Sequence, residues 1–269
     1  MIIPTSLPPP VTQILRHYLN LQLGDKQITC PYFISKKATR WDLLFNYRLQ
    51  GKGSPAEIEN LTKHIAQQSN FNLNQATSSQ IRQFMRRKGI GVDCSGFTYH
   101  LLKAFHQSET ITDISTILKR PISFNPLNWL RHIRYRLDVR AFTSLRNSYP
   151  LSQLNQLRPG DLIRMESGKH VLIILEHKNN QIIYAHSSYK TTKIKGVHLS
   201  KITITKPSQS LENQIWHERT PSRKSLKTHY HPENEDGIFR LKAWDVVPAK
   251  AGIHALKLKS RHGSRYTSG

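Results

Sequence analysis

The spacing of hydrophobic residues changes along the chain, from a helical period in the first half to a strand period in the second. In the first half, apolar residues recur every three or four positions, which is typical of amphipathic helices. This period predicts helices over residues 11–23, 55–68, 78–88 and 94–105. A strand with a bend at its proline is expected at 26–34.

The second half contains short apolar segments that predict strands, over residues 161–165, 170–176, 181–186, 197–204 and 237–247. The segment 170–176 is almost continuously apolar, which is typical of a strand buried on both faces. Turn-forming residues separate it from 181–186, so these two segments are expected to form a hairpin.

Several segments between and beyond these elements are polar or rich in proline. Residues 1–10 are expected to form an extended arm, 217–236 a mobile polar loop, and 249–269 a disordered basic tail. Residues 107–158 are less clear, although Asn125 and Pro126 indicate a helix start. This segment is strongly basic, and its charges form either a solvated face or a surface for an anionic polymer; they belong to Arg131, His132, Arg134, Arg136 and Arg140.

The charge of the whole chain points to an acidic partner. Among 269 residues, 40 are Lys or Arg and 17 are Asp or Glu, which gives a net charge of +23. Charge alone allows three classes of partner: a nucleic acid, an anionic membrane surface or an anionic cell-wall polymer. No apolar stretch is long enough to span a membrane. The first residues lack the basic start and long apolar core of a signal peptide, and the sequence does not decide the localisation.

The two cysteines have different surroundings in the sequence. Cys30 lies in a predicted strand and is interpreted as structural. Cys94 lies where a glycine-containing turn meets a predicted helix, and a helix N-terminus favours the thiolate, with a thiol pKa as low as roughly 3.5–7.5. The alternative for Cys94 is a small buried apolar residue. Three histidines in the polar loop match no standard zinc pattern, so no metal or other cofactor is expected; they are His217, His229 and His231.

A cysteine nucleophile needs a base and a group that orients the base. In a hairpin that turns at 177–180, paired residue numbers sum to about 356 or 357, so His170 lies opposite His186 or its neighbour. Residues directly opposed in this way share a face of the sheet. His170 can therefore take the thiol proton, and His186 can hold the other ring nitrogen of His170.

Four segments resemble the motifs of the NlpC family of cell-wall cysteine peptidases. Residues 93–97 (DCSGF) resemble the nucleophile motif, and 157–163 (LRPGDLI) the turn and strand that follow it. His170 with Val171 resembles the strand start that carries the base, and 184–187 (YAHS) the strand of the third polar residue. The resemblance covers roughly residues 78–247.

This resemblance implies an α+β, papain-like fold, with the nucleophile at the N-terminus of a helix packed on an antiparallel sheet. It implies a catalytic set of Cys94, His170 and His186, with Asp93 and Ser95 at the amino group of the substrate. Asp93 could equally cap the helix. The implied reaction is hydrolysis of peptidoglycan stems, at the γ-D-glutamyl–diamino acid link, without a cofactor.

The sequence departs from the family in three places, one of which is a long insertion between Cys94 and Pro159. The family carries a tyrosine shortly before the cysteine that helps to stabilise the oxyanion, and the corresponding stretch 84–91 has none. Residues 1–77 match no known cell-wall module and are assigned to an accessory region, before a peptidase domain at 78–248 and the tail at 249–269.

Three alternatives to a peptidase stay open at this point. The first is a papain-like acyltransferase, and the second is a basic cell-wall-binding protein without activity. The third, a nucleic-acid-binding protein, rests on charge alone and is not expected, because the sequence contains no recognised DNA- or RNA-binding motif.

Overall fold

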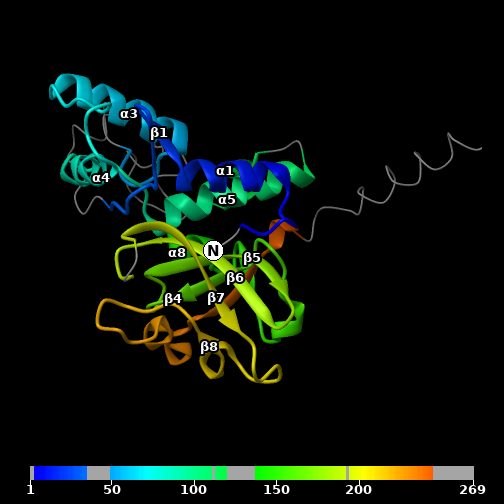
Figure 1. Cartoon of the computed structure of the whole chain (residues 1–269). Coiled ribbons are helices and arrows are strands. Elements are labelled where there is room, and N and C mark those ends of the chain that lie inside the picture. Colours follow the sequence, from blue (N-terminus) through cyan, green and yellow to red (C-terminus); the bar gives the residue numbers. More distant parts are fainter. Residues whose placement is uncertain (1–2, 35–48, 111–112, 120–136, 192–193, 245–269) are drawn as a thin grey trace, which may run out of the picture.

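The structure, a computed structural model of the whole chain, describes residues 3–34, 49–110, 113–119, 137–191 and 194–244. It is an α+β protein in which a group of helices packs against a curled antiparallel sheet (Figure 1). The predicted helix start at Asn125, most of the basic residues near it, and the predicted tail lie outside the described residues.

The helices form where the hydrophobic period predicts them. Among the helices that the structure describes, the four longest are α1 (Pro9–Leu19), α3 (Pro55–Gln68), α4 (Ser78–Arg87) and α5 (Cys94–Glu109), and two single turns follow, α6 (Ile114–Ile117) and α8 (Val139–Phe142). The start of α3 is set by a capping box, in which the Ser54 hydroxyl and the Glu57 carboxylate each accept a backbone N–H. Thr77 and Gln80 form the same arrangement at the start of α4.

The first predicted helix is wrong at its C-terminal end. Instead of continuing to residue 23, α1 stops at Leu19, and the chain forms a small hairpin of β1 (Leu21–Leu23) and β2 (Lys26–Ile28). Gly24 makes the tight turn possible, since its φ of 65° is costly for other residues. Leu21 and Leu23 follow Tyr18 and Leu19 by three and four positions, which is why the helical period extended too far, but both leucines are buried as the alternate residues of a strand.

In the described part of the chain, the main sheet has seven strands in the order β3-β9-β4-β5-β6-β7-β8, and every neighbouring pair is antiparallel. Their bounds are β3 (Ser148–Leu151), β4 (Leu162–Met165), β5 (His170–Lys178), β6 (Gln181–Ser188), β7 (Gly196–Thr203), β8 (Ile215–Trp216) and β9 (Gly237–Leu241). β9 ends six residues earlier than the predicted strand 237–247, and the chain continues into a short 3-10 turn (Lys242–Trp244).

The predicted hairpin is present as β5 and β6, but the predicted register is wrong. Asn179 and Asn180 alone form the turn, both with positive φ, and pairing runs through Lys178↔Gln181 to Ile173↔Ala185. A β-bulge between Ile174 and Glu176 shifts the register by one residue. Continued to the strand start, this register places Ser188 in line with His170, so His186 is a diagonal neighbour of His170.

The two faces of the sheet bury different clusters of apolar side chains. One cluster lies between the sheet and the helices, where Phe97 and Leu101 of α5 meet Val171 and Ile173 of β5. The other covers the opposite face and includes Leu172 and the residues packed around Tyr184 and Trp216. α5 contacts β5 and β6 directly, and α1 lies along α5 (Figure 1).

Residues before position 77 are part of the same core. Tyr18 on α1 packs edge-on against Phe97, and its hydroxyl donates to the carbonyl of Gly53. Residues 30–32 lie between two distant segments: Tyr32 forms a parallel bridge with Val92, and Pro31 an antiparallel bridge with Gly196. The proposed division at residues 77 and 78 therefore crosses a continuously packed region.

The segment 217–236, predicted as a mobile loop, is folded onto the sheet. It contains a bridge between Arg219 and Ser225 and two 3-10 turns, at Leu226–His229 and Pro232–Asn234. Leu226 and Tyr230 of this segment are buried in the second apolar cluster. Among the described helices, none has the length and apolar character required to cross a membrane.

Candidate active site

Cys94 is the first residue of α5, and the structure buries it against the start of β5, a central strand of the sheet. Its side chain is 5% exposed, and Sγ lies 3.9 Å from the carbonyl oxygen of Lys169, directly before His170. The N–H of Val171, directly after His170, also contributes a hydrogen bond to the sulfur. The thiol therefore lies against the backbone on both sides of His170, at the start of β5.

Burial overturns the expectation of a low thiol pKa. Loss of water around the sulfur and the nearby carboxylate of Asp93 raise the pKa of Cys94 to about 12. Lys52 and the N–H groups of Val171 and Ser95 act in the opposite direction but are outweighed. In the free protein Cys94 is consequently a thiol at neutral pH, and its reaction as a nucleophile requires a base.

His170 and His186 meet at the end of the hairpin. Nε2 of His170 lies 2.7 Å from Nδ1 of His186, with the two rings inclined at 64°. Both side chains are buried, and burial, followed by the neighbouring His186, holds the pKa of His170 well below its usual range. His170 is therefore neutral at physiological pH, which a proton acceptor must be.

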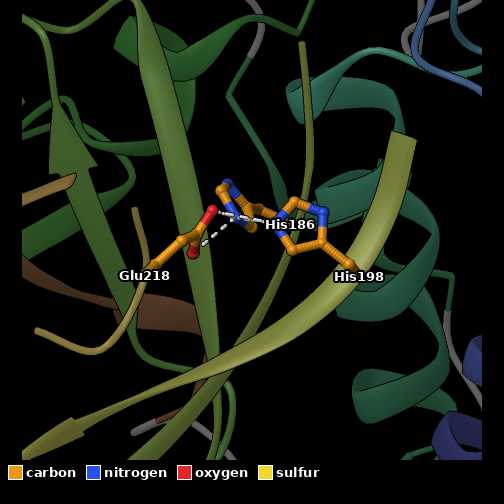
Figure 2. Close-up of side chains that lie close together, drawn as sticks. All are labelled: His186, His198 and Glu218. Atoms are coloured by element: carbon orange, nitrogen blue, oxygen red, sulfur yellow. Dashed lines mark hydrogen bonds and ion pairs between the residues drawn. The ribbon is translucent and has the colours of Figure 1, made fainter. Parts of the chain in front are cut away.

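His186 also hydrogen-bonds to Glu218, a residue that the sequence analysis did not identify. Its Nε2 lies 3.0 Å and 3.1 Å from the two carboxylate oxygens of Glu218, and 2.9 Å from Nε2 of His198 (Figure 2). Glu218 is 7% exposed and also accepts a hydrogen bond from the Tyr184 hydroxyl at 2.7 Å. Burial acts to raise the pKa of Glu218, but His186 and His198 outweigh burial and hold this pKa far below its usual range.

These contacts assign the protons of the histidine pair. Because a carboxylate only accepts, His186 donates from Nε2 to Glu218, and its Nδ1 then accepts from Nε2–H of His170. Nδ1 of His170 is left with a lone pair. A histidine in this tautomer can accept a proton from a thiol.

Asp93 and Ser95, the expected substrate-binding residues, hydrogen-bond within the protein. The Asp93 carboxylate caps α5 by accepting from Gly96 N–H at 2.6 Å, and it pairs with the buried Lys52 at 2.9 Å. The Ser95 hydroxyl donates to Asp93 at 3.1 Å and also contacts the ammonium of Lys52. The capping role of Asp93 is thus observed, whereas contact with a substrate stays a prediction.

A tyrosine lies beside the cysteine, although the sequence stretch before Cys94 has none. Tyr32 pairs with Val92, and Phe33 N–H donates to the Val92 carbonyl at 3.3 Å. Burial raises the pKa of the Tyr32 hydroxyl, and the neighbouring Cys94 and Asp93 raise it further. Sequence reasoning missed Tyr32 because 62 positions separate it from Cys94. The only local signal was the Pro31-Tyr32 pair within the predicted strand.

The three histidines of the polar segment do not form a group. His217 bonds to Thr203, His231 to Glu233, and His229 lies 4.0 Å from Glu166. Within the described residues, the group with the geometry to hold a metal ion consists of His186, His198 and Glu218. Cys30 is fully buried, which raises its pKa and agrees with a structural role. Comparison of the chain with protein-family models and with curated proteins gave no match.

Proposed function

We propose that the protein is a cysteine-dependent hydrolase with a papain-like arrangement, which cleaves the peptide stems of peptidoglycan. The observation that carries this proposal is the order of groups at the hairpin end. A thiol at a helix start adjoins the backbone of His170, and His170 in turn contacts His186 at 2.7 Å. Nucleophile, base and orienting group in this order are the requirement for covalent catalysis.

The proposed mechanism starts from a neutral pair. Nδ1 of His170 takes the thiol proton as Cys94 attacks the carbonyl carbon of the scissile amide. His170 then returns this proton to the leaving amine, and water hydrolyses the acyl-enzyme by the reverse proton route. His186 and Glu218 keep Nε2 of His170 protonated, so that only Nδ1 acts as the base.

The oxyanion is proposed to form between the backbone N–H of Cys94 and the hydroxyl of Tyr32. The raised pKa of Tyr32 keeps this hydroxyl protonated and able to donate. Loss of one oxyanion donor typically reduces kcat by about 10²–10³. We therefore expect Tyr32→Phe to lower kcat by about this factor with little change in KM.

The substrate assignment is supported by the motif resemblance and by charge. Peptidoglycan stems carry carboxylates, and wall polymers are anionic, which suits a chain with a net charge of +23. The γ-D-glutamyl–diamino acid link is the bond that the resemblance implies. An acyltransferase with the same catalytic groups would instead pass the acyl group to an added amine acceptor.

Digestion of purified peptidoglycan, followed by mass analysis of the fragments, tests the proposal. The unmodified protein is expected to release stem fragments, and Cys94→Ala to release none. Cys30→Ala is the matched control, since it removes the other cysteine and is expected to keep activity. Cleavage by Cys94→Ala would refute the mechanism, and intact peptidoglycan in every sample would refute the substrate.

A further inference from the structure

Three side chains converge beyond the histidine pair, on the side away from Cys94. They come from three strands or their ends: His186 from β6, His198 from β7, and Glu218 from the chain just after β8 (Figure 2). Nε2 of His198 lies 2.8 Å from the Glu218 carboxylate and 2.9 Å from Nε2 of His186. One nitrogen from each ring and one carboxylate oxygen thus face a common point.

The atoms that face away from this point are all held by other groups. Nδ1 of His198 donates to the carbonyl of Gly196 at 2.9 Å. The second oxygen of Glu218 accepts from the Tyr184 hydroxyl, and Nδ1 of His186 contacts His170. Metal-binding histidines and carboxylates are characteristically oriented by such bonds on their remaining atoms.

The geometry brings three potential metal ligands to one centre. Nδ1 of His198 donates to Gly196, so its Nε2 points to the centre, at hydrogen-bond distance from the Glu218 carboxylate and from Nε2 of His186. Histidine must be deprotonated at the nitrogen that binds a metal, so an entering ion displaces the protons that lie between these atoms. A cation placed among the three would be attracted to every one of them.

The site also has room for a fourth ligand. His198 and Glu218 line a cavity of about 380 Å³ between β7 and the segment after β8, together with Leu199, His217 and Arg219. Two histidine nitrogens, one carboxylate oxygen and a water molecule form a common tetrahedral zinc set. Bonds of about 2.0–2.1 Å would separate the ligands to about 3.3 Å. The present 2.8–3.0 Å contacts therefore need only a small opening.

We propose that His186, His198 and Glu218 form a binding site for one divalent metal ion of the zinc class, with water from the cavity as the fourth ligand. Nitrogen and carboxylate ligands in this geometry favour zinc over calcium or magnesium, which prefer oxygen alone. The ion reaches the site through the cavity lined by His198.

Metal binding has a consequence for His170, and this part of the proposal rests on the proposed function. A metal on Nε2 of His186 displaces the proton there, so the neutral ring carries its proton on Nδ1 and donates it to Nε2 of His170. His170 then holds its own proton on Nδ1, taken up from solvent as the other is released. In this tautomer His170 cannot accept the proton of Cys94, and zinc inhibits hydrolysis.

Metal binding is tested without any activity measurement. Isothermal titration of the metal-free full chain with ZnCl₂ is expected to show one tight site, and Co²⁺ to give the intense visible bands of a tetrahedral complex. His198→Asn should weaken binding by at least ~100-fold, and Tyr184→Phe, which loses only an orienting bond, by about 10-fold. His217→Asn is the matched control, since it lines the same cavity outside the cluster and should bind as the unmodified chain does.

The outcomes separate the two proposals. Absence of zinc binding, an octahedral cobalt spectrum, or equal binding by His198→Asn and the unmodified chain would overturn the metal site. Inhibition is measured as the hydrolysis rate with zinc relative to the zinc-free rate of the same variant, with reversal by EDTA. Inhibition that persists in His198→Asn would overturn the tautomer switch. If the protein cleaves no peptidoglycan, the titration and the cobalt spectrum still decide the metal site.

Discussion

Two buried carboxylates flank the candidate catalytic groups, and they are held in contrasting ways. Asp93 precedes Cys94 and pairs with Lys52, a permanent cation, while it also caps α5. Glu218 contacts two histidines and a tyrosine hydroxyl. The Asp93 carboxylate fixes the start of α5, whereas the Glu218 carboxylate contacts histidines whose protons can move.

The two carboxylates differ because the nucleophile and the base are positioned in different ways. Cys94 is fixed by a local feature, a capped helix start, and by the close approach of the Gly51 carbonyl to Gly96, which leaves no space for a Cβ there. His170 is fixed by a series of contacts that ends at Glu218, more than forty residues further along the chain. One measurement of thiol reactivity and three substitutions test this contrast.

The largest expected effect is in the reactivity of the thiol beside Asp93. Because burial and Asp93 raise the pKa of Cys94 to about 12, alkylation by iodoacetamide at pH 8 should be roughly 1,000-fold slower than for a free cysteine. The rate should rise about tenfold per pH unit between pH 7 and 10. Cys94→Ala, which retains only the buried Cys30, is the control. A rate independent of pH above 7 would show that the thiolate is already formed.

Lys52→Met should be the most destabilising of the three substitutions. It leaves the buried Asp93 carboxylate without its cation, a change that typically costs about 3–5 kcal/mol. The free energy of unfolding in urea measures the loss. Lys63→Met on α3 is the matched control, because Lys63 is exposed and should change stability by less than ~0.5 kcal/mol. Equal effects of the two substitutions would mean that the Lys52–Asp93 pair does not stabilise the folded protein.

Glu218→Gln should cost less, about 1–3 kcal/mol, because the amide keeps the shape and one acceptor. The folded-state pKa of Glu218 is lower than its unfolded value, so its stabilisation is full above about pH 4.3 and is lost as pH falls below that. Urea unfolding in EDTA at pH 7 and pH 4 should therefore show a smaller difference from the unmodified chain at pH 4. Glu212→Gln, at an exposed site, should show no difference at either pH.

The smallest effect is expected at an exposed carboxylate. Slight burial acts to raise the pKa of Asp113, but the hydrogen bonds from Lys103 and Ser115 outweigh it and lower the pKa to about 2. Asp113→Asn keeps the cap of α6 and removes only the charge. The free energy of unfolding, measured by thermal unfolding, should change by at most ~1 kcal/mol, and by less in 0.5 M salt. A larger, salt-independent loss would contradict the distinction between exposed and buried pairs.

The sequence was sufficient where interactions are local. The capping residues Ser54 and Thr77, the helix after Cys94, and the hairpin with His170 and His186 all follow from spacing over a few residues. The hairpin register did not, because the polar residues at 177–180 indicate a four-residue turn, whereas β5 and β6 continue to Lys178 and Gln181 and leave a two-residue turn. The histidines still meet, since diagonal neighbours on a sheet are within reach of long side chains.

The remaining parts of the site depend on contacts between distant residues. Tyr32 lies near Cys94 only because residues 30–32 pair with Val92 and Gly196. Glu218 lies in a polar segment without periodicity, and its burial follows from packing of Leu226 and Tyr230 below the sheet. The thiol pKa was expected at the wrong end of its range because a helix start is visible in a sequence, whereas the loss of surrounding water is not.

The position of residues 30–32 has a consequence for the order of folding. Tyr32 must find Val92 across 60 residues, and Pro31 must find Gly196 across 165. Contacts of such long range form slowly, after local helices and hairpins. During synthesis Val92 follows Tyr32 by 60 residues, so their bridge can form early, whereas Gly196 emerges much later. The nucleophile and its neighbouring tyrosine can therefore come together before the second bridge exists, and the strand that starts at Gly196 fixes residues 30–32 in place only afterwards.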